Sequence, residues 1–168
     1  YPSMNLGFIF TEAAQLDSKV LSYGKFRASF ANVGNGAPSP YLTSNFFNAT
    51  APVQGQLSFE PNGEIGNPNL RPETTSTIEF GTDLRFFENR FGLDVTWYRS
   101  ETTDPIIISF IPSSSGYTTA VLNGDGPIRN TGLEILFNAT ILEAETNRQL
   151  GWESSLNFNS LRNEVVSI

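Results

Sequence analysis

The sequence predicts an all-β fold: an antiparallel transmembrane β-barrel, of which this chain is a fragment of about six meander strands. Three observations lead to this prediction. Apolar and polar residues alternate with a period of two over most of the chain, as side chains do along a strand. Runs of about 13 residues or more carry this pattern in most of these segments, which exceeds the usual strand of a globular sheet. Short and long connections between these segments alternate along the chain.

Six segments of the chain carry this alternation of apolar and polar residues. Residues 11–22 lie between the first two and are a candidate for a short helix or an irregular turn. No run of about 18 apolar residues occurs, so no transmembrane helix is expected. The expected strands are 4–10, 24–33, 74–87, 91–104, 129–143 and 151–165.

Each expected strand is apolar on one face and polar on the other. The apolar face is buried in a soluble sandwich, but it meets lipid in an outer-membrane barrel, so the alternation alone leaves both open. The apolar sets are Phe26, Ala28 and Phe30; Ile78, Phe80, Thr82, Leu84 and Phe86; Phe91, Leu93, Val95 and Trp97; Leu133, Ile135, Phe137, Ala139 and Ile141; and Trp152, Leu156 and Phe158. The opposite faces hold Lys25, Arg27, Glu79, Asp83, Arg85, Asp94, Glu134 and Glu153.

The connections favour the barrel. Short turns are expected at 88–90 and 144–150, and long loops at 35–73 and 112–128. In an antiparallel meander this order puts all short turns at one end, as in outer-membrane barrels with short periplasmic turns and long extracellular loops. The strand length also suits the 9–11 residues that cross a bilayer. Aromatic residues near the short turns fit an interfacial girdle, namely Phe86, Phe87, Phe91 and Trp152.

Composition excludes several classes of protein. The 168 residues suffice for one domain, and their formal net charge of −7 argues against nucleic-acid binding. The absence of Cys and His excludes disulfides, Cys-His and Ser-His-Asp catalytic sites, and metal sites that need His or Cys. The chain starts with Tyr1 and shows no signal-peptide pattern, so we expect an excerpt of a longer protein.

The turn at 88–90 predicts a register for its two strands. A two-residue turn at Asn89-Arg90 pairs Arg85 with Asp94, a polar pair on the barrel wall, and sets Gly81 opposite Tyr98. The alternative four-residue connection places Asp83 opposite Asp94. We prefer the first register because opposite charges facing across strands are stabilising and like charges are not.

Other motifs carry no clear chemistry, so neither a catalytic residue nor a metal ligand nor a cofactor is expected. Glu79 and Asp83 lie four apart on one strand, roughly 13 Å, which is too far for a glycosidase pair. The segment 122–128 lacks the spacing of a calcium loop. The two "NAT" sequons, 48–50 and 138–140, are interpreted as chance.

The long loops hold aromatic candidates for substrate binding. Aromatic platforms beside Asn or Asp commonly hold sugars or peptides. The alternative is that these side chains pack the loops together or onto a partner. The candidates are Tyr41, Phe46, Phe47, Phe110 and Tyr117, with Phe59 as a further loop aromatic.

Six segments of the chain carry motifs in a characteristic order. They are "YPSMNLGFIF" (1–10), "KFRASFANVGN" (25–35), "GNPNLRPETTSTIEFGTDLRF" (66–86), "RFGLDVTWYRSETTDPI" (90–106), "GPIRNTGLEILFNATI" (126–141) and "WESSLNFNSLRNEVVSI" (152–168). With these segments, nearly the whole chain resembles the C-terminal part of the barrel of a SusC/RagA-type TonB-dependent outer-membrane transporter. The "NPNLRPE" motif is shared with many TonB-dependent receptors, and the order of the motifs makes the resemblance specific.

The resemblance implies nutrient uptake across the outer membrane of a Gram-negative bacterium, without enzymatic activity. The implied partners are a surface-exposed SusD-like lipoprotein, TonB acting through a plug domain, a glycan or peptide substrate, and outer-membrane lipid. The plug, the TonB box and further strands are absent from this chain. The alternatives are a lid-less siderophore or cobalamin receptor, a passive porin, and a secreted β-sandwich that serves binding or adhesion.

Overall fold

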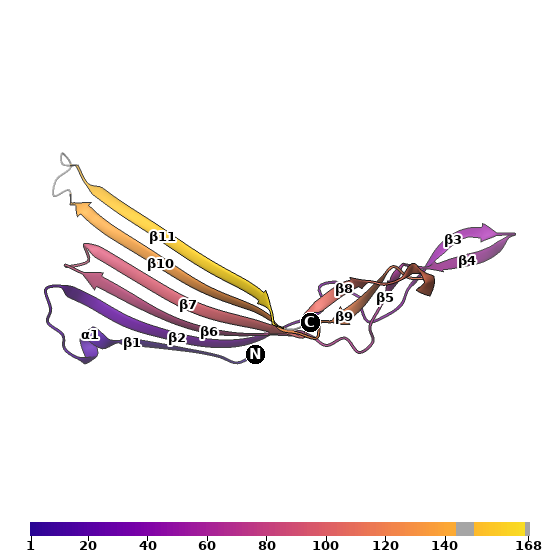
Figure 1. The fold of residues 1–168 in the computed structure, drawn as a ribbon, viewed down its shortest axis with the longest axis horizontal. Helices are drawn as coiled ribbons and strands as arrows, with labels where there is room; N and C mark the ends of the chain where they lie inside the picture. Colours follow the sequence, from indigo (N-terminus) through magenta and orange to yellow (C-terminus); the bar gives the residue numbers. More distant parts are fainter. Residues whose placement is uncertain (144–149, 167–168) are drawn as a thin grey trace. The chain divides into compact units, whose positions relative to one another are not determined.

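The computed structural model describes residues 1–143 and 150–166, and it is almost entirely β-structure (Figure 1). The chain forms two compact units, which are described separately. The first comprises 1–33, 76–101 and 129–164, and the second comprises 34–75, 102–128 and the chain from 165. No helix in the described ranges has the length and apolar character needed to cross a membrane.

An antiparallel sheet of six long strands dominates the fold and confirms the predicted fold class. Its strands lie in the order β1-β2-β6-β7-β10-β11, which is the order in which they occur along the chain (Figure 1). Each predicted strand is present, with ends that differ by a few residues. The strands are β1 (Ser3–Ile9), β2 (Leu21–Asn35), β6 (Glu73–Phe86), β7 (Phe91–Thr103), β10 (Ile128–Leu142) and β11 (Trp152–Val165).

The segment between β1 and β2 contains the helix α1 (Phe10–Ala13), which is only four residues long. Gly24 of β2 leaves room for the ring of Phe10, which occupies the place of a side chain there. The hydroxyl of Thr11 accepts a hydrogen bond of 3.1 Å from the Gly24 amide. The candidate helix 11–22 is therefore a single helical turn tied to β2 and followed by an irregular connection.

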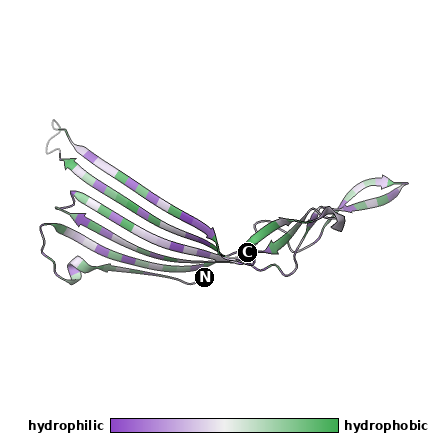
Figure 2. Ribbon diagram, viewed as in Figure 1, coloured by the Kyte–Doolittle hydropathy of each residue, from purple (hydrophilic) through white to green (hydrophobic). Residues whose placement is uncertain are grey.

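The period of two predicts which residues share a face, and the pairing of β1 with β2 shows this directly. Leu6 lies opposite Ala28 and Phe8 lies opposite Phe26, so apolar residues face apolar residues across the strands. Bands of alternating hydropathy cross the strands of the sheet (Figure 2). Leu6, Phe8 and Phe26 are all more than half exposed, so no second layer of the described residues covers them.

The turn between β6 and β7 shows that the predicted register is wrong by two residues. The Arg90 amide donates a 3.2 Å hydrogen bond to the Phe87 carbonyl, and Glu88 and Asn89 between them both have positive φ. This is the geometry of a two-residue type I′ turn, but one that is centred on Glu88-Asn89. Two side-chain contacts agree with it: Thr77 with Ser100 at 3.2 Å, and Thr75 with Thr102 at 2.9 Å.

The corrected register sets Asp83 opposite Asp94, the arrangement that sequence analysis disfavoured. Arginines compensate for the like charges, because Arg27 pairs with Asp83 and Arg85 pairs with Asp94. Tyr98, expected opposite Gly81, instead lies over Gly132 of β10.

The second unit contains short strands, which lie within the predicted long loops except for one strand that precedes the loop 112–128. β3 (Phe47–Val53) and β4 (Gln56–Pro61) form an antiparallel hairpin. A three-stranded sheet has the order β5-β9-β8, in which β5 (Glu64–Ile65) runs parallel to β9 (Thr119–Asn123), and β8 (Ile106–Phe110) runs antiparallel to β9. A 3₁₀ turn, η1 (Ser113–Ser115), lies between β8 and β9.

Val121 of β9 is only 1% exposed, and Leu42 of the same unit is also buried.

Of the two predicted short turns, the one at 144–150 lies outside the described residues except for its last position.

Candidate functional site

The polar face of the six-stranded sheet is held by side chains that reach across several strands. Arg27 of β2 lies 3.3 Å from the Asp83 carboxylate of β6, measured from Nη2 to Oδ1. The same nitrogen donates a 3.3 Å hydrogen bond to the hydroxyl of Thr96 on β7. One arginine therefore joins three neighbouring strands on this face. Gly81 makes this possible, because a Cβ there would stand 3.1 Å from the Arg27 guanidinium.

Arg85 and Asp94, the polar pair expected from the sequence, lie 3.3 Å apart between Nη1 and Oδ2. In the observed register they are diagonal rather than direct neighbours, a separation that a long side chain can span. Arg85 also donates to the carbonyl of Leu84 at 3.2 Å. Both side chains are partly exposed, so the pair contributes about 0–1 kcal/mol to stability.

The polar face also has a shallow hollow between β1, β2 and β6. It has a volume of about 310 Å³, and Asn5, Lys25, Arg27, Ser29 and Glu79 contribute its polar lining. Its mixed charges and hydroxyls can hydrogen-bond water or a polar solute. This face therefore resembles the lining of an aqueous passage rather than a reaction site.

A second polar cluster, the loop junction, is formed by Arg71, Glu73, Asp104, Ile106 and Asn123. Arg71 pairs with Asp104 at 2.7 Å. The Asn123 side chain accepts from the Arg71 amide and donates to the carbonyls of Arg71 and Asp104, each at 2.9 Å. Glu73 accepts a 2.7 Å hydrogen bond from the Ile106 amide. The junction thus fastens the end of the connection between β2 and β6 to the start and to a later part of the connection between β7 and β10.

Sequence analysis missed the junction, although it singled out the "NPNLRPE" motif that supplies half of it. The sequence feature that could have indicated the junction is the charged Arg-Pro-Glu segment at the start of a long strand. Its partners, Asp104 and Asn123, lie far along the chain and have no local pattern. Asn123 belongs to the segment that was considered for calcium, and its amide group is committed to backbone atoms.

The loop aromatics remain candidates for substrate contact, and the structure brings two of them together. The rings of Tyr41 and Phe46 meet edge to face with centroids 5.4 Å apart, and both side chains are exposed. Phe47 begins β3, where it lies opposite Pro61. Phe110 ends β8 and is 88% exposed, whereas Tyr117 is half-buried.

Comparison with known proteins gives consistent matches over almost the whole chain. The family model described as "TonB dependent receptor-like, beta-barrel" matches residues 1–165. "TonB-dependent receptor P3" of Formosa agariphila is 30% identical over 156 residues, which cover 90% of this chain and 15% of that protein. "TonB-dependent receptor SusC" of Bacteroides thetaiotaomicron is 26% identical over 175 residues, covering 100% of this chain and 17% of SusC.

A solved structure of the RagAB peptide transporter superposes with a TM-score of 0.86 at 26% identity, covering 97% of this chain and 18% of the matched chain. The chain thus spans less than a fifth of the length of each of these relatives.

Proposed function

Since this chain belongs to the TonB-dependent receptor-like β-barrel family, we propose that it forms part of the wall and the extracellular loops of an outer-membrane active transporter. The transporter imports oligosaccharides or peptides, draws its energy from TonB and works with a surface lipoprotein lid. The observation that carries this proposal is the match of nearly the whole chain both to the β-barrel family model and to a chain of the RagAB peptide transporter.

The two faces of the sheet support the role of a barrel wall. One face presents exposed aromatic and aliphatic side chains, which suit lipid, and the other presents ion pairs and hydroxyls, which suit a wet interior. A sheet edge without a partner cannot remain in the hydrocarbon of a membrane. The six strands therefore need the remaining strands of the full-length protein to form a barrel.

The class of substrate is proposed from the relatives and from the loops. RagAB is titled a peptide transporter, and SusC belongs to the same receptor family. Exposed aromatic rings beside Asn side chains, such as Tyr41 and Phe46 in a segment rich in Asn, suit both sugars and peptides. A surface lipoprotein would close over such loops.

Purification of the full-length protein from its host tests the proposal. We expect a detergent-requiring protein in the outer-membrane fraction that carries a surface lipoprotein with it. Uptake of labelled oligosaccharides and peptides by intact cells, with and without the proton gradient that drives TonB, then identifies the substrate. A barrel that transports without any lipoprotein would favour the lid-less receptor, and a protein that stays soluble without detergent would favour the β-sandwich.

A further inference from the structure

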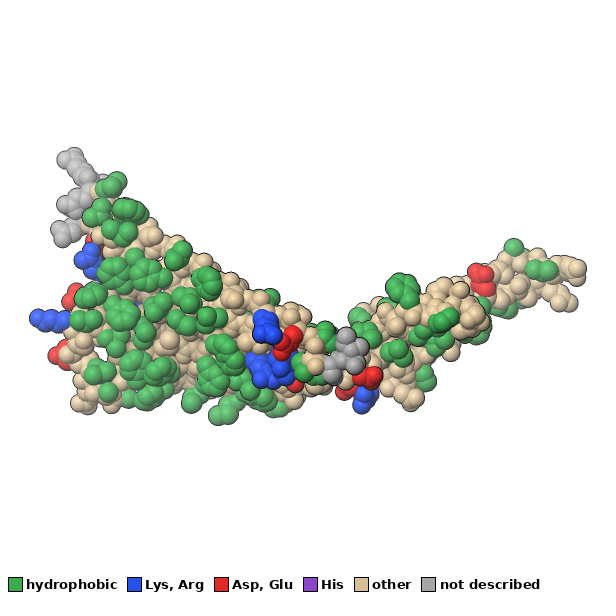
Figure 3. All heavy atoms as spheres, viewed as in Figure 1, with side chains coloured by type: hydrophobic (Ala, Val, Ile, Leu, Met, Phe, Trp, Pro, Cys, Tyr) green, Lys and Arg blue, Asp and Glu red, His purple; other side chains and the backbone are tan. Residues whose placement is uncertain are grey.

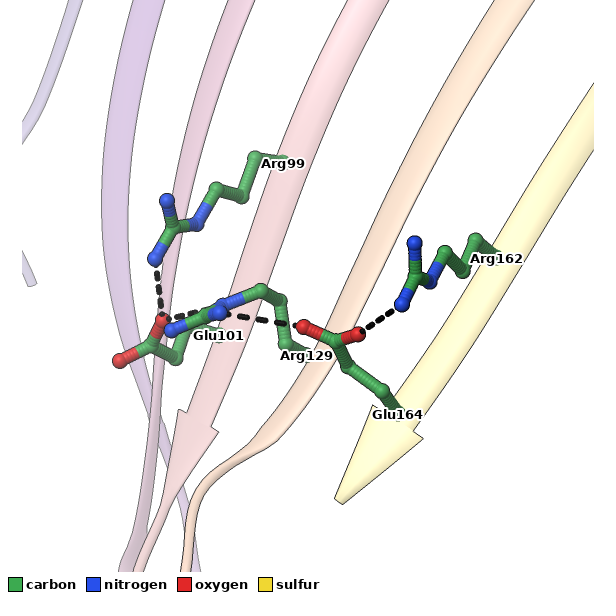
Figure 4. Close-up of polar contacts among 5 residues, drawn as sticks. All are labelled: Arg99, Glu101, Arg129, Arg162 and Glu164. Carbon is green, nitrogen blue, oxygen red and sulfur yellow. Dashed lines mark hydrogen bonds and ion pairs between the residues drawn. The ribbon is translucent and has the colours of Figure 1, made fainter. Parts of the chain in front are cut away.

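A cluster of charged residues interrupts the apolar face of the sheet. It consists of Arg99 and Glu101 on β7, Arg129 on β10, and Arg162 and Glu164 on β11 (Figure 4). Because strand side chains alternate, these residues share the face of the apolar sets. Figure 3 shows this face, where Arg and Asp or Glu side chains gather beyond the broad field of apolar side chains on the sheet.

The five side chains form one continuous series of ion pairs. Glu101 accepts from Arg99 at 2.9 Å and from Arg129 at 3.0 Å. Glu164 accepts from Arg129 at 3.1 Å and from Arg162 at 3.0 Å (Figure 4). Three arginines stand against two carboxylates, so the cluster carries a net charge of +1. Arg129 uses two nitrogens on two carboxylates, whereas Arg99 and Arg162 contact one carboxylate each.

The arginines surround a hollow of about 470 Å³ on this face. Arg99, Arg129 and Arg162 line it together with Trp97 and Leu133, which belong to the apolar field. The Arg162 side chain is 80% exposed, so its remaining donors are accessible. The hollow therefore combines cationic donors with an apolar border that includes an indole ring.

The position of the cluster along the strands indicates its depth in a membrane. β7 leads into the long connection that ends at β10, so the cluster lies at the end of the strands opposite the Glu88-Asn89 turn. In the proposed transporter this is the extracellular end. Charges on a lipid-facing surface are costly at mid-membrane and tolerated near the interfaces, and Trp prefers the headgroup level. The cluster therefore lies at the level of the outer headgroups.

The cluster is local and does not form part of a continuous charged belt. At the same end of neighbouring β2 and β6, the corresponding outward positions are Asn32, Gly34, Thr74 and Ser76, all uncharged. A general attraction to an anionic membrane surface would call for cations on these strands as well. The concentration of three arginines around one hollow instead indicates a discrete ligand.

We propose that this hollow binds a phosphate group of an anionic lipid in the outer leaflet. Arginine guanidinium groups bind phosphate oxygens through paired, charge-assisted hydrogen bonds. The two glutamates hold the three guanidinium groups side by side, and the net positive charge leaves a place for an anion. Trp97 and Leu133 contact the start of the acyl chains. The proposal rests on the proposed function, because it needs this face to meet the membrane.

The test measures lipid binding to the delipidated full-length transporter in detergent by native mass spectrometry. The probes are lipid A with two phosphates and the same lipid A after dephosphorylation, with inorganic phosphate as a competitor. The variant Arg99→Gln/Arg162→Gln removes the two most accessible cations. Arg90→Gln is the matched control, because it removes one cation at the other end of β7. Heat-dependent migration in gel electrophoresis verifies that each variant has a folded barrel.

We expect phosphorylated lipid A to bind the wild type and the Arg90→Gln control alike, and to bind the double variant at least tenfold more weakly. Dephosphorylated lipid A should bind all three proteins weakly and equally. Equal binding of phosphorylated lipid A to all proteins would overturn the proposal. Displacement of the lipid by millimolar inorganic phosphate would indicate a site for free phosphate and overturn the lipid assignment.

A change in oligomeric state of the double variant, with unchanged lipid binding, would assign the cluster to a protein contact and also overturn the proposal. Uptake by cells that express the double variant separates this question from the proposed function. Normal uptake with unchanged lipid binding refutes only the lipid site, whereas a wild-type protein that needs no detergent refutes both.

Discussion

Aromatic side chains in this chain fill the space left by glycines on neighbouring segments, and two such pairs are Phe10 on Gly24 and Tyr98 on Gly132. The Tyr98 ring occupies the place where a side chain at Gly132 would begin. An aromatic ring that packs over a glycine on the adjacent strand helps to fix the register of the two strands. The close approach requires glycine at position 132, and no larger residue fits without moving the ring.

Substitution of Gly132 by Ala should destabilise the barrel by about 1–3 kcal/mol, the usual cost of overpacking. Unfolding of the full-length protein by urea in lipid vesicles measures the effect. Gly36→Ala is the matched control, because nothing lies within 4 Å of the Cβ that it adds. The double variant Gly132→Ala/Tyr98→Ser should recover part of the loss, and an equal loss with and without Tyr98 would contradict the packing argument.

Asn123 is the central residue of the loop junction. Its side chain makes three hydrogen bonds to backbone atoms of Arg71 and Asp104, and a hydrogen bond of this kind contributes about 0.5–1.5 kcal/mol to stability. Asn123→Ala should therefore speed hydrogen exchange at Arg71 and Ile106 in the full-length protein, far more than Asn69→Ala, which alters an exposed side chain on the same motif. Similar exchange in both variants would show that the junction holds without this side chain.

Among the elements, the long strands were predictable and the short ones were not. A run such as 129–143 repeats the alternation often enough to exceed chance, so the apolar set Leu133, Ile135 and Phe137 defines it. β5 has only two residues and pairs with β9 across a large part of the chain. β5 is stabilised by its pairing with β9, and the sequence around β5 does not predict that pairing.

The register of β6 and β7 failed for a related reason. The sequence "ENR" allows a two-residue turn at either of two positions, and the choice depends on backbone angles at Glu88 and Asn89. Charge pairing between Arg85 and Asp94 favoured the wrong choice, because the compensation of Asp83 by Arg27 comes from another strand. The same limit applies to the loop junction, whose members come from separate segments.

Disulfide cross-linking can distinguish the two registers, and the absence of Cys from these 168 residues simplifies the design. Thr77→Cys/Ser100→Cys should form a disulfide under mild oxidation, because the two native hydroxyl oxygens lie 3.2 Å apart and a disulfide needs Cβ atoms roughly 4 Å apart. Thr77→Cys/Thr102→Cys, which fits the rejected register, is the control and should remain reduced. A gel shift after proteolysis between the strands reports each bond.

At the scale of the whole molecule, the distribution of apolar surface is the main feature. Exposed large hydrophobic side chains occupy outward positions on all six strands of the sheet, and further ones lie in the second unit, where Val121 is fully buried. A soluble protein of this design would expose an apolar patch far beyond the few hundred Å² that monomers tolerate. The apolar face of the sheet is suited to contact with lipid.

A charge substitution on the apolar face tests this interpretation. Phe137 lies outward on β10, between the middle of the strand and its short-turn end, and stacks on Phe91 with ring centroids 6.2 Å apart. Phe137→Arg should destabilise the barrel in lipid vesicles by about 1–2 kcal/mol, which lies between the cost of a cation near an interface and its cost at the bilayer midplane. Asn138→Arg, one residue along on the opposite face, should have little effect. Comparable losses from both variants would contradict the assignment of the faces.

The loop junction has a consequence for engineering the specificity of such a transporter. It ties Arg71 and Glu73, at the end of one connection, to Asp104, Ile106 and Asn123 in the other. The parallel pairing of Glu64 with Thr119 joins the same two connections again. The two connections are therefore joined into one structural unit. A chimaera that exchanges 35–72 alone would lose the contacts between the two connections. Transfer of binding specificity to another transporter therefore requires that 104–127 be exchanged together with 35–72.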